Sequence, residues 1–339
     1  MPPTAAAADN ALAARLLNEF QRGFPLVPEP YAAIARSLGV REAQVRSTLA
    51  AACADGRVSR VGAVFRPGTV GASTLAALAV PPADLARVAA LVSARREVNH
   101  NYEREHRYNL WFVATAPDAA ALAAALAGIA AESGLPPIAL PLVTDYWIDL
   151  GFDLAGNGEA PRLPAAVAAP RTTALTAADR RLLAALEDGL PVRPAPFAAL
   201  ARAAGTTEAA VLARLARWLG DGVIRRFGVV VRHRALGFTA NAMCVWDVAD
   251  DAVDTAGAAL AREPGVTLCY RRRRAAPHWR YNLYCMLHGR DRSTVEAQRA
   301  RLAAAHGLDT CASAVLFSRR AFKQCGARYT AGTPAVAAA

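Results

Sequence analysis

The chain has 339 residues, of which 54% are hydrophobic and 20% charged, so it is not a disordered protein and has room for two to four domains. Its formal net charge is +11 and Lys323 is the only lysine, so arginines carry the charge and favour a polyanionic partner, either nucleic acid or a polycarboxylate. The longest charge-free apolar run, residues 119–131, is shorter than the about 18 residues that span a bilayer. The N-terminal residues do not resemble a secretory signal. We therefore expect a cytoplasmic protein without membrane contact.

An internal repeat relates the two halves of the chain. Residues 24–40 and 190–206 are identical at eight of 17 positions, and residues 55–65 match 221–231 at five of 11. Both pairs are offset by 166 residues, and a constant offset indicates a duplication. Residues 108–110 correspond to 281–283 at an offset of 173, so the second half carries a seven-residue insertion.

Each half begins with a pattern typical of a winged helix-turn-helix. Apolar residues at helical spacing predict helices at 11–21, 31–37 and 41–54 in the first half, and at 177–187, 197–203 and 207–219 in the second. A proline precedes each middle helix, and Gly39 or Gly205 ends it. Alternating residues at 58–65 and 223–232 predict a wing hairpin in each half. We therefore place winged helix-turn-helix domains at 1–70 and 174–236.

The rest of each half predicts a ferredoxin-like βαββαβ domain. The expected order is strand 74–80, helix 82–95, strands 98–102 and 109–116, helix 119–133 and strand 138–152. The second half repeats it with strand 239–248, helix 252–263, strands 266–271 and 281–287, helix 292–306 and strand 311–323. The predicted fold class is thus α+β, with ferredoxin-like domains at 71–155 and 237–330, a linker at 156–173 and a disordered tail at 331–339.

Two motifs carry a family resemblance. Residues 100–112 are HNYEREHRYNLWF, residues 269–272 are CYRR and residues 281–289 are YNLYCMLHG. The domain order resembles the Lrp/AsnC regulators, and the motifs resemble one branch of them, the siroheme decarboxylases of heme d1 biosynthesis, in the form that fuses two subunits. The pattern departs at His278, where the family more often has an acidic residue.

The resemblance implies a carboxy-lyase. Such enzymes convert siroheme to 12,18-didecarboxysiroheme by removing two acetate carboxylates as CO2, and they need no cofactor beyond the iron of the substrate. The carbanion left by each decarboxylation requires a proton, and histidine titrates nearest to working pH. We therefore predict His100 and His106 as proton donors together with Tyr102. One of the two histidines is alternatively an axial ligand of the substrate iron, and which one is left open.

Siroheme carries eight carboxylates, which arginine binds well through paired hydrogen bonds. The predicted substrate-binding residues are Arg104, Arg107, Tyr108, Asn109, Trp111, Arg271, Arg272, Arg273, Arg274, Arg280 and Tyr281. An acetate held against Trp111, Tyr108 or Tyr102 would lose water and be destabilised. The alternatives are structural: strand core for the aromatic residues, a turn closure for Asn109, a solvated hairpin tip for Arg271–Arg274, and a structural role for His288.

We expect the two halves to pair within one chain as an intramolecular pseudo-dimer, with each first-half motif facing a second-half motif across a cleft. The pseudo-symmetric pocket would be degenerate, because Leu268 stands at the place of His100 and Trp279 at that of His106. Further homodimerisation and the order of the two decarboxylations are left open. The rival classes are a DNA-binding regulator and a non-catalytic tetrapyrrole-binding protein. DNA is not expected, because the second recognition helix begins at Thr207 with almost no base-reading groups.

Overall fold

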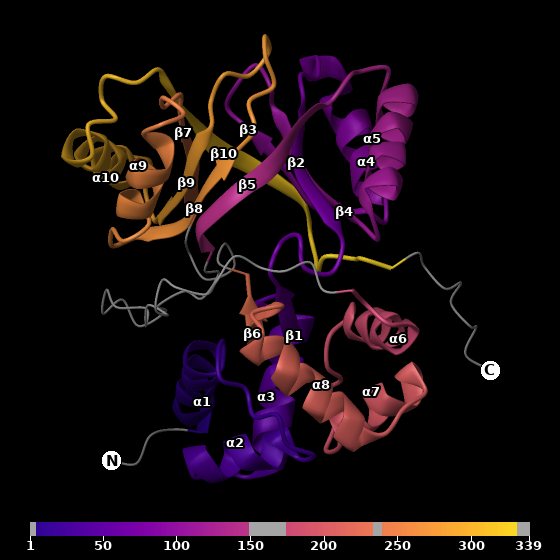
Figure 1. Cartoon of the computed structure of the whole chain (residues 1–339). Coiled ribbons are helices and arrows are strands. Elements are labelled where there is room, and N and C mark those ends of the chain that lie inside the picture. Colours follow the sequence, from indigo (N-terminus) through magenta and orange to yellow (C-terminus); the bar gives the residue numbers. More distant parts are fainter. Residues whose placement is uncertain (1–4, 149–173, 233–238, 331–339) are drawn as a thin grey trace.

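A computed structural model of the chain describes residues 5–148, 174–232 and 239–330, which form a helical lobe and a barrel lobe (Figure 1). The predicted linker at 156–173, the end of the predicted strand at 149–152 and the predicted tail at 331–339 lie outside the described residues. Within the described ranges, no helix is both long enough and apolar enough to cross a membrane.

The helical lobe combines the first segments of both halves. The first half contributes α1 (Ala5–Glu19), α2 (Pro30–Leu38), α3 (Glu42–Ala54) and β1 (Val58–Phe65), and the second contributes α6 (Ala177–Leu186), α7 (Pro196–Ala204), α8 (Glu208–Gly220) and β6 (Ile224–Val231). Pro30 and Pro196 begin the middle helices, and Gly39 and Gly205 end them with left-handed φ angles of 68° and 65°. The three-helix pattern is confirmed in both halves.

The prediction of a wing hairpin within each half is wrong. Each half supplies one strand, and β1 and β6 pair with each other as a two-stranded antiparallel ribbon, called the ribbon below. Gly62 lies opposite Gly228, its own counterpart at an offset of 166, so a pseudo-twofold axis passes between them. Alternation in the sequence identifies a strand but not its partner, which here comes from the other half.

The barrel lobe contains both α/β units in the predicted order. The first has β2 (Ala72–Leu78), a short 3-10 helix (Pro82–Asp84), α4 (Leu85–Ala94), β3 (Val98–Arg104), β4 (Leu110–Ala116), α5 (Ala119–Ser133) and β5 (Ile138–Ile148). The second has β7 (Ala240–Trp246), α9 (Val253–Leu260), β8 (Val266–Arg272), β9 (Leu283–Gly289), α10 (Arg292–Ala305) and β10 (Ser313–Gln324). Asp118 and Asp291 cap α5 and α10, each accepting a bond from the backbone N–H three residues on.

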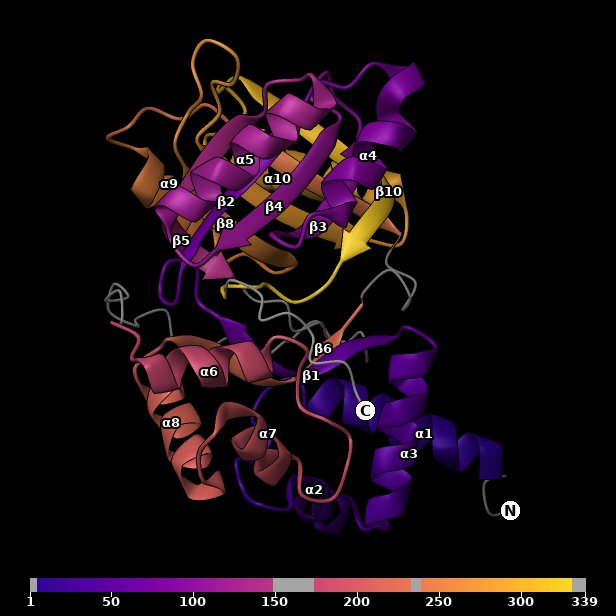
Figure 2. The same ribbon diagram turned by 90° about the vertical axis from the view of Figure 1, so that its right-hand side faces the viewer.

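The eight strands of both units close into one antiparallel barrel. Their order is β10-β3-β4-β2-β5-β8-β9-β7, so each unit keeps the ferredoxin-like order and the units join at β3–β10 and β5–β8. The helices pack outside, α4 and α5 on one flank and α9 and α10 on the other, as Figures 1 and 2 show. Closure leaves the barrel sheet without a free edge and creates an interior to which both halves contribute.

Aromatic and aliphatic side chains fill the barrel interior at the end away from the helical lobe. Trp111, Trp279 and Tyr284 are almost fully buried there. At the other end, Asp145 of β5 joins the two lobes: Arg66 donates Nη2 to Asp145 Oδ1 at 3.0 Å, and Arg225 of β6 also pairs with Asp145. The helical lobe is thereby held across the open end of the barrel.

Candidate functional site

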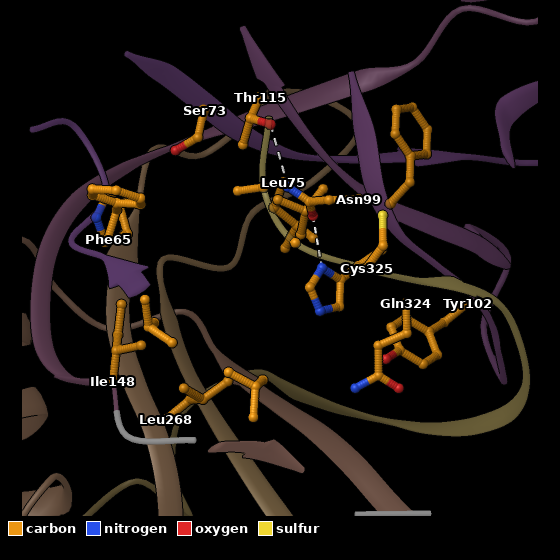
Figure 3. Close-up of a pocket in the computed structure, with 18 of the residues that line it drawn as sticks. Phe65, Ser73, Leu75, Asn99, Tyr102, Thr115, Ile148, Leu268, Gln324 and Cys325 are labelled. Carbon is orange, nitrogen blue, oxygen red and sulfur yellow. Dashed lines mark hydrogen bonds between the residues drawn. The ribbon is translucent and has the colours of Figure 1, made fainter. Parts of the chain in front are cut away.

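A cavity of about 310 Å³ lies between the open end of the barrel and the ribbon. This volume is at the lower end of the range of about 300–1,000 Å³ that small-molecule sites occupy. Its lining comes from the barrel strands of both halves, from the ribbon, and from residues 325–330 after β10, called the C-terminal strap below. Figure 3 shows Phe65 of the ribbon on one side of this space and Tyr102 and Gln324 on the other.

Strand β3 directs the first-half motif into the cavity. His100, Tyr102 and Arg104 line it, whereas Asn101 between them points outward and donates Nδ2 to Ala89 O of α4 at 3.1 Å. The His100 and Tyr102 rings stack with centroids 6.2 Å apart. The alternation of side chains along a strand explains why three of these residues share one face.

Asn99 also lines the cavity and orients His100. Nδ1 of His100 lies 2.6 Å from Oδ1 of Asn99, and Nδ2 of Asn99 donates to Oγ1 of Thr115 at 3.3 Å, the two contacts dashed in Figure 3. Because the amide oxygen only accepts, this arrangement assigns the proton of a neutral His100 to Nδ1. In that tautomer Nε2 carries the lone pair, which is the form that can take up a proton or bind a metal.

A second histidine in the cavity, His288 of β9, was assigned a structural role by sequence reasoning. His288 lies directly opposite Asn241 in the β7–β9 register, and its Nδ1 contacts Oδ1 of Asn241. Both residues line the cavity, so each half contributes one imidazole held by one asparagine. The signal in the sequence was the alternation that puts Met286 and His288 on one strand face, but the sequence did not identify that face as the barrel interior.

Arginines from both halves also line the cavity. Arg104 and Arg272 occupy equivalent positions at an offset of 168, next to Tyr102 and Tyr270. Arg104 donates Nη1 to Leu316 O at 3.1 Å, and Arg272 donates Nη1 to Leu140 O at 2.7 Å and stacks 4.6 Å from the Tyr270 ring. Trp111 lines the same cavity, so the site combines cations with an apolar wall.

Comparison with known proteins decides the family. A family model described as siroheme decarboxylase NirDL-like HTH domain matches residues 14–57 and 179–225, and one described as AsnC-like ligand binding domain matches 69–146 and 235–323. The siroheme decarboxylase NirDL subunit of Paracoccus denitrificans is 48% identical over 314 residues, which cover 92% of this chain and 95% of that protein. The chain belongs to the siroheme decarboxylase NirDL family.

Two further relatives agree with this assignment. The siroheme decarboxylase NirD subunit of Pseudomonas aeruginosa is 55% identical over 146 residues, 43% of this chain and 97% of that subunit. A crystal structure of the siroheme decarboxylase NirDL in co-complex with an iron-uroporphyrin III analogue superposes with a TM-score of 0.67 at 26% identity, covering 95% of this chain and 94% of that one. The family resemblance of the sequence motifs is therefore confirmed.

Several residues predicted for the site of this siroheme decarboxylase family member do not line the cavity. They are His106, Arg107, Tyr108, Asn109, Arg271, Arg273, Arg274, Arg280 and Tyr281. Most belong to the turns that join β3 to β4 and β8 to β9, at the barrel end away from the helical lobe (Figure 1). Membership of the same motifs did not bring these residues to the cavity, because β3 and β8 carry the chain to the opposite end of the barrel.

His106 is part of an aromatic plug at that far end, which also includes Tyr108, Trp279 and Tyr281. Its ring lies 5.2 Å from the Trp279 ring, and its Nδ1 accepts the backbone N–H of Tyr108 at 3.0 Å. Burial, and to a smaller extent the charge of Arg107, lowers the pKa of His106. His106 is therefore packed among aromatic rings and does not line the cavity.

Three of the remaining arginines, and Asn109, have partners within the protein. Arg271 and Arg274 form ion pairs with Asp250, and Arg280 pairs with Asp247, while Arg273 is exposed. The side chain of Asn109 bonds both backbone groups of Val80 at 2.9 Å. Asn282 does the same to Val248 in the second half, so both halves contain this contact.

We expected two pockets, one active and one degenerate, and the structure differs from this expectation. His100 and its counterpart Leu268 line the same cavity. The closed barrel places both halves around one axis, so within the described residues the two equivalent positions share one site and do not form two.

Proposed function

We propose that this chain is a carboxy-lyase that converts siroheme to 12,18-didecarboxysiroheme in the cytoplasm. The observation that carries the proposal is one cavity that gathers two asparagine-bound imidazoles, His100 and His288, with Arg104 and Arg272 from opposite halves. The family relatives named siroheme decarboxylase support it, as does the related structure with an iron-uroporphyrin III analogue. The two halves act as an intramolecular pseudo-dimer, and one chain holds one complete site.

His100 and His288 divide two roles. Each acetate loses CO2 and gains a proton, so that a methyl group replaces the acetate, and a protonated imidazole next to the reacting methylene supplies that proton. The other imidazole binds the substrate iron through Nε2. Tyr102 stacks beside His100 and limits the space for the reacting group. This assignment replaces His106 with His288, because His106 lies in the aromatic plug.

Arg104 and Arg272 bind carboxylates of the substrate, and the apolar wall formed by Trp111 destabilises the carboxylate that reacts. Arg104 and Arg272 form charge-assisted pairs with the acidic side chains of the macrocycle. An acetate placed against Trp111 loses water that the neutral methyl product does not need, which favours decarboxylation. The reaction uses no organic cofactor in this proposal, because the substrate ring delocalises the electrons.

The test is anaerobic incubation of purified protein with siroheme and no added cofactor, followed by mass spectrometry of the tetrapyrrole. We expect a product that has lost two CO2 units. Siroheme recovered with unchanged mass, from protein that binds it, would contradict the proposal and favour a tetrapyrrole carrier.

A further inference from the structure

Arg60 brings a guanidinium from the ribbon to the cavity. It belongs to β1 of the helical lobe, yet it lines the same space as His100 and His288. Its Nη2 donates to Ala63 O at 3.0 Å, and no carboxylate of the described residues forms an ion pair with it. A cation that lines a cavity without an ionic partner from the protein is suited to an anionic ligand.

Three glycines leave room for this side chain. A Cβ atom added at Gly326 of the C-terminal strap would lie 3.0 Å from Cζ and 3.1 Å from Nη1 of Arg60. A Cβ atom at Gly189, in the loop between α6 and α7, would lie 2.9 Å from Arg60 Cβ, and Gly62 also borders the side chain. Residues of β1, of the loop after α6 and of the C-terminal strap therefore surround the Arg60 side chain, with a glycine in each of the three segments.

The repeat offers an internal comparison. Arg226 of β6 is the counterpart of Arg60 at an offset of 166, and it makes the equivalent bond, from Nη1 to Val229 O at 3.1 Å. Arg226 makes a second bond to Gln21 O at 2.6 Å and does not line the cavity. Arg226 therefore bonds to two backbone carbonyl groups of the helical lobe. Within the described residues, the Arg60 guanidinium has only the bond to the carbonyl group of Ala63, and it lines the cavity. Burial lowers the pKa of both guanidinium groups, which indicates that each cation is poorly hydrated.

We propose that Arg60 is a specificity-determining residue that binds a carboxylate of the tetrapyrrole at the edge facing the helical lobe. The helix-turn-helix module is then part of the substrate site, and its ribbon forms the floor on which the macrocycle rests. This inference rests on the proposed function, because it takes the same ligand in the same cavity.

The test compares Arg60→Gln, Arg60→Lys and the parent by spectroscopic titration with iron uroporphyrin III. We expect Arg60→Gln to weaken binding about tenfold and Arg60→Lys to recover most of the loss, because lysine keeps the charge. With siroheme, KM should rise while kcat changes little, since the contact is present before and during the reaction.

Two control variants separate binding from structure. Arg226→Gln removes the equivalent guanidinium of the second half and should lower the thermal midpoint of unfolding without changing affinity for iron uroporphyrin III. Arg57→Gln removes one charge from the same end of the ribbon, where Arg57 pairs with Asp55 outside the cavity, and should change neither. Parental affinity in Arg60→Gln, or a loss equal to that in Arg226→Gln, would overturn the inference. A parent that neither binds iron uroporphyrin III nor decarboxylates siroheme would instead overturn the proposed function.

Discussion

The Nδ1 atom of His100 lies 2.6 Å from Oδ1 of Asn99, a neighbouring residue on the same strand. Two consecutive residues of a regular strand point to opposite faces, and here a register shift between Val98 and His100 in the β3–β4 pairing allows both to line the cavity. The bond fixes which imidazole nitrogen faces the ligand.

Replacing Asn99 should therefore impair His100 without removing it. Asn99→Leu should reduce the decarboxylation rate about 10- to 100-fold, the usual cost of losing a residue that orients a reactive histidine. Asn99→Asp retains an acceptor oxygen and should recover part of the rate, with the pH profile shifted because a carboxylate raises the pKa of a neighbouring imidazole. A parental rate and pH profile in Asn99→Leu would show that the bond has no role in the reaction.

The two histidines of the cavity should matter more than the histidine of the aromatic plug. His100→Ala and His288→Ala should each lower single-turnover decarboxylation about 100-fold or more, and the variant that loses the iron ligand should also change the visible spectrum of bound siroheme. His106→Ala should keep turnover within a few-fold of the parent. Strong loss of turnover in His106→Ala with an unchanged melting profile would restore His106 to the site.

The plug histidine should make stability depend on pH. The pKa of His106 lies below its ordinary value of 6.5, mainly through burial, so the unfolded chain takes up this proton at higher pH than the folded chain. The free energy of unfolding should consequently fall as pH decreases from above 6.5 toward the lowered pKa. Urea denaturation at a series of pH values checks this, with His106→Phe expected to flatten the dependence in that window. An identical slope in the two proteins would contradict it.

Glu187 should hold the C-terminal strap on the helical lobe. Its Oε1 accepts bonds from the backbone N–H groups of Tyr329 and Thr330 at 2.9 and 3.0 Å, and its Oε2 pairs with Arg96 at 2.6 Å. Glu187→Gln should lower the free energy of unfolding by about 1–3 kcal/mol, because buried donors lose a charged acceptor. Glu132→Gln, which removes an exposed carboxylate paired with Arg95, is the control and should cost about 0–1 kcal/mol. Equal losses in denaturant titrations would mean that the strap is not held by this carboxylate.

The close approach at Gly228 gives a steric prediction. A Cβ atom there would lie 2.4 Å from Phe20 O and 2.5 Å from Gln21 O, both backbone atoms that cannot rotate away. Gly228→Ala should destabilise the chain by about 1–3 kcal/mol, as overpacking does. Gly220→Ala, in α8 with nothing within 4 Å of the new atom, should be neutral or stabilising. Thermal denaturation of both variants distinguishes these outcomes.

Local signals in the sequence determined the helices, the strands and their repetition. Pro30, Gly39 and their counterparts end or begin helices through their own backbone preferences, so the pattern is visible without knowledge of any neighbour. The alternation around His100 and Tyr102 likewise predicted that these two side chains share a face, and the motifs correctly indicated the family.

Only the tertiary structure decided which of the predicted residues meet. The pairings β3–β10, β5–β8 and β1–β6 join residues from different halves, and no local preference specifies such partners. Closure of the barrel put His288 into the cavity and His106 into the plug at the other end, and the ribbon added Arg60. The spacing of apolar residues in the sequence predicts on which face of a strand a side chain lies. The end of the barrel at which that side chain lies, and the residues that face it across the cavity, depend on long-range packing of both halves.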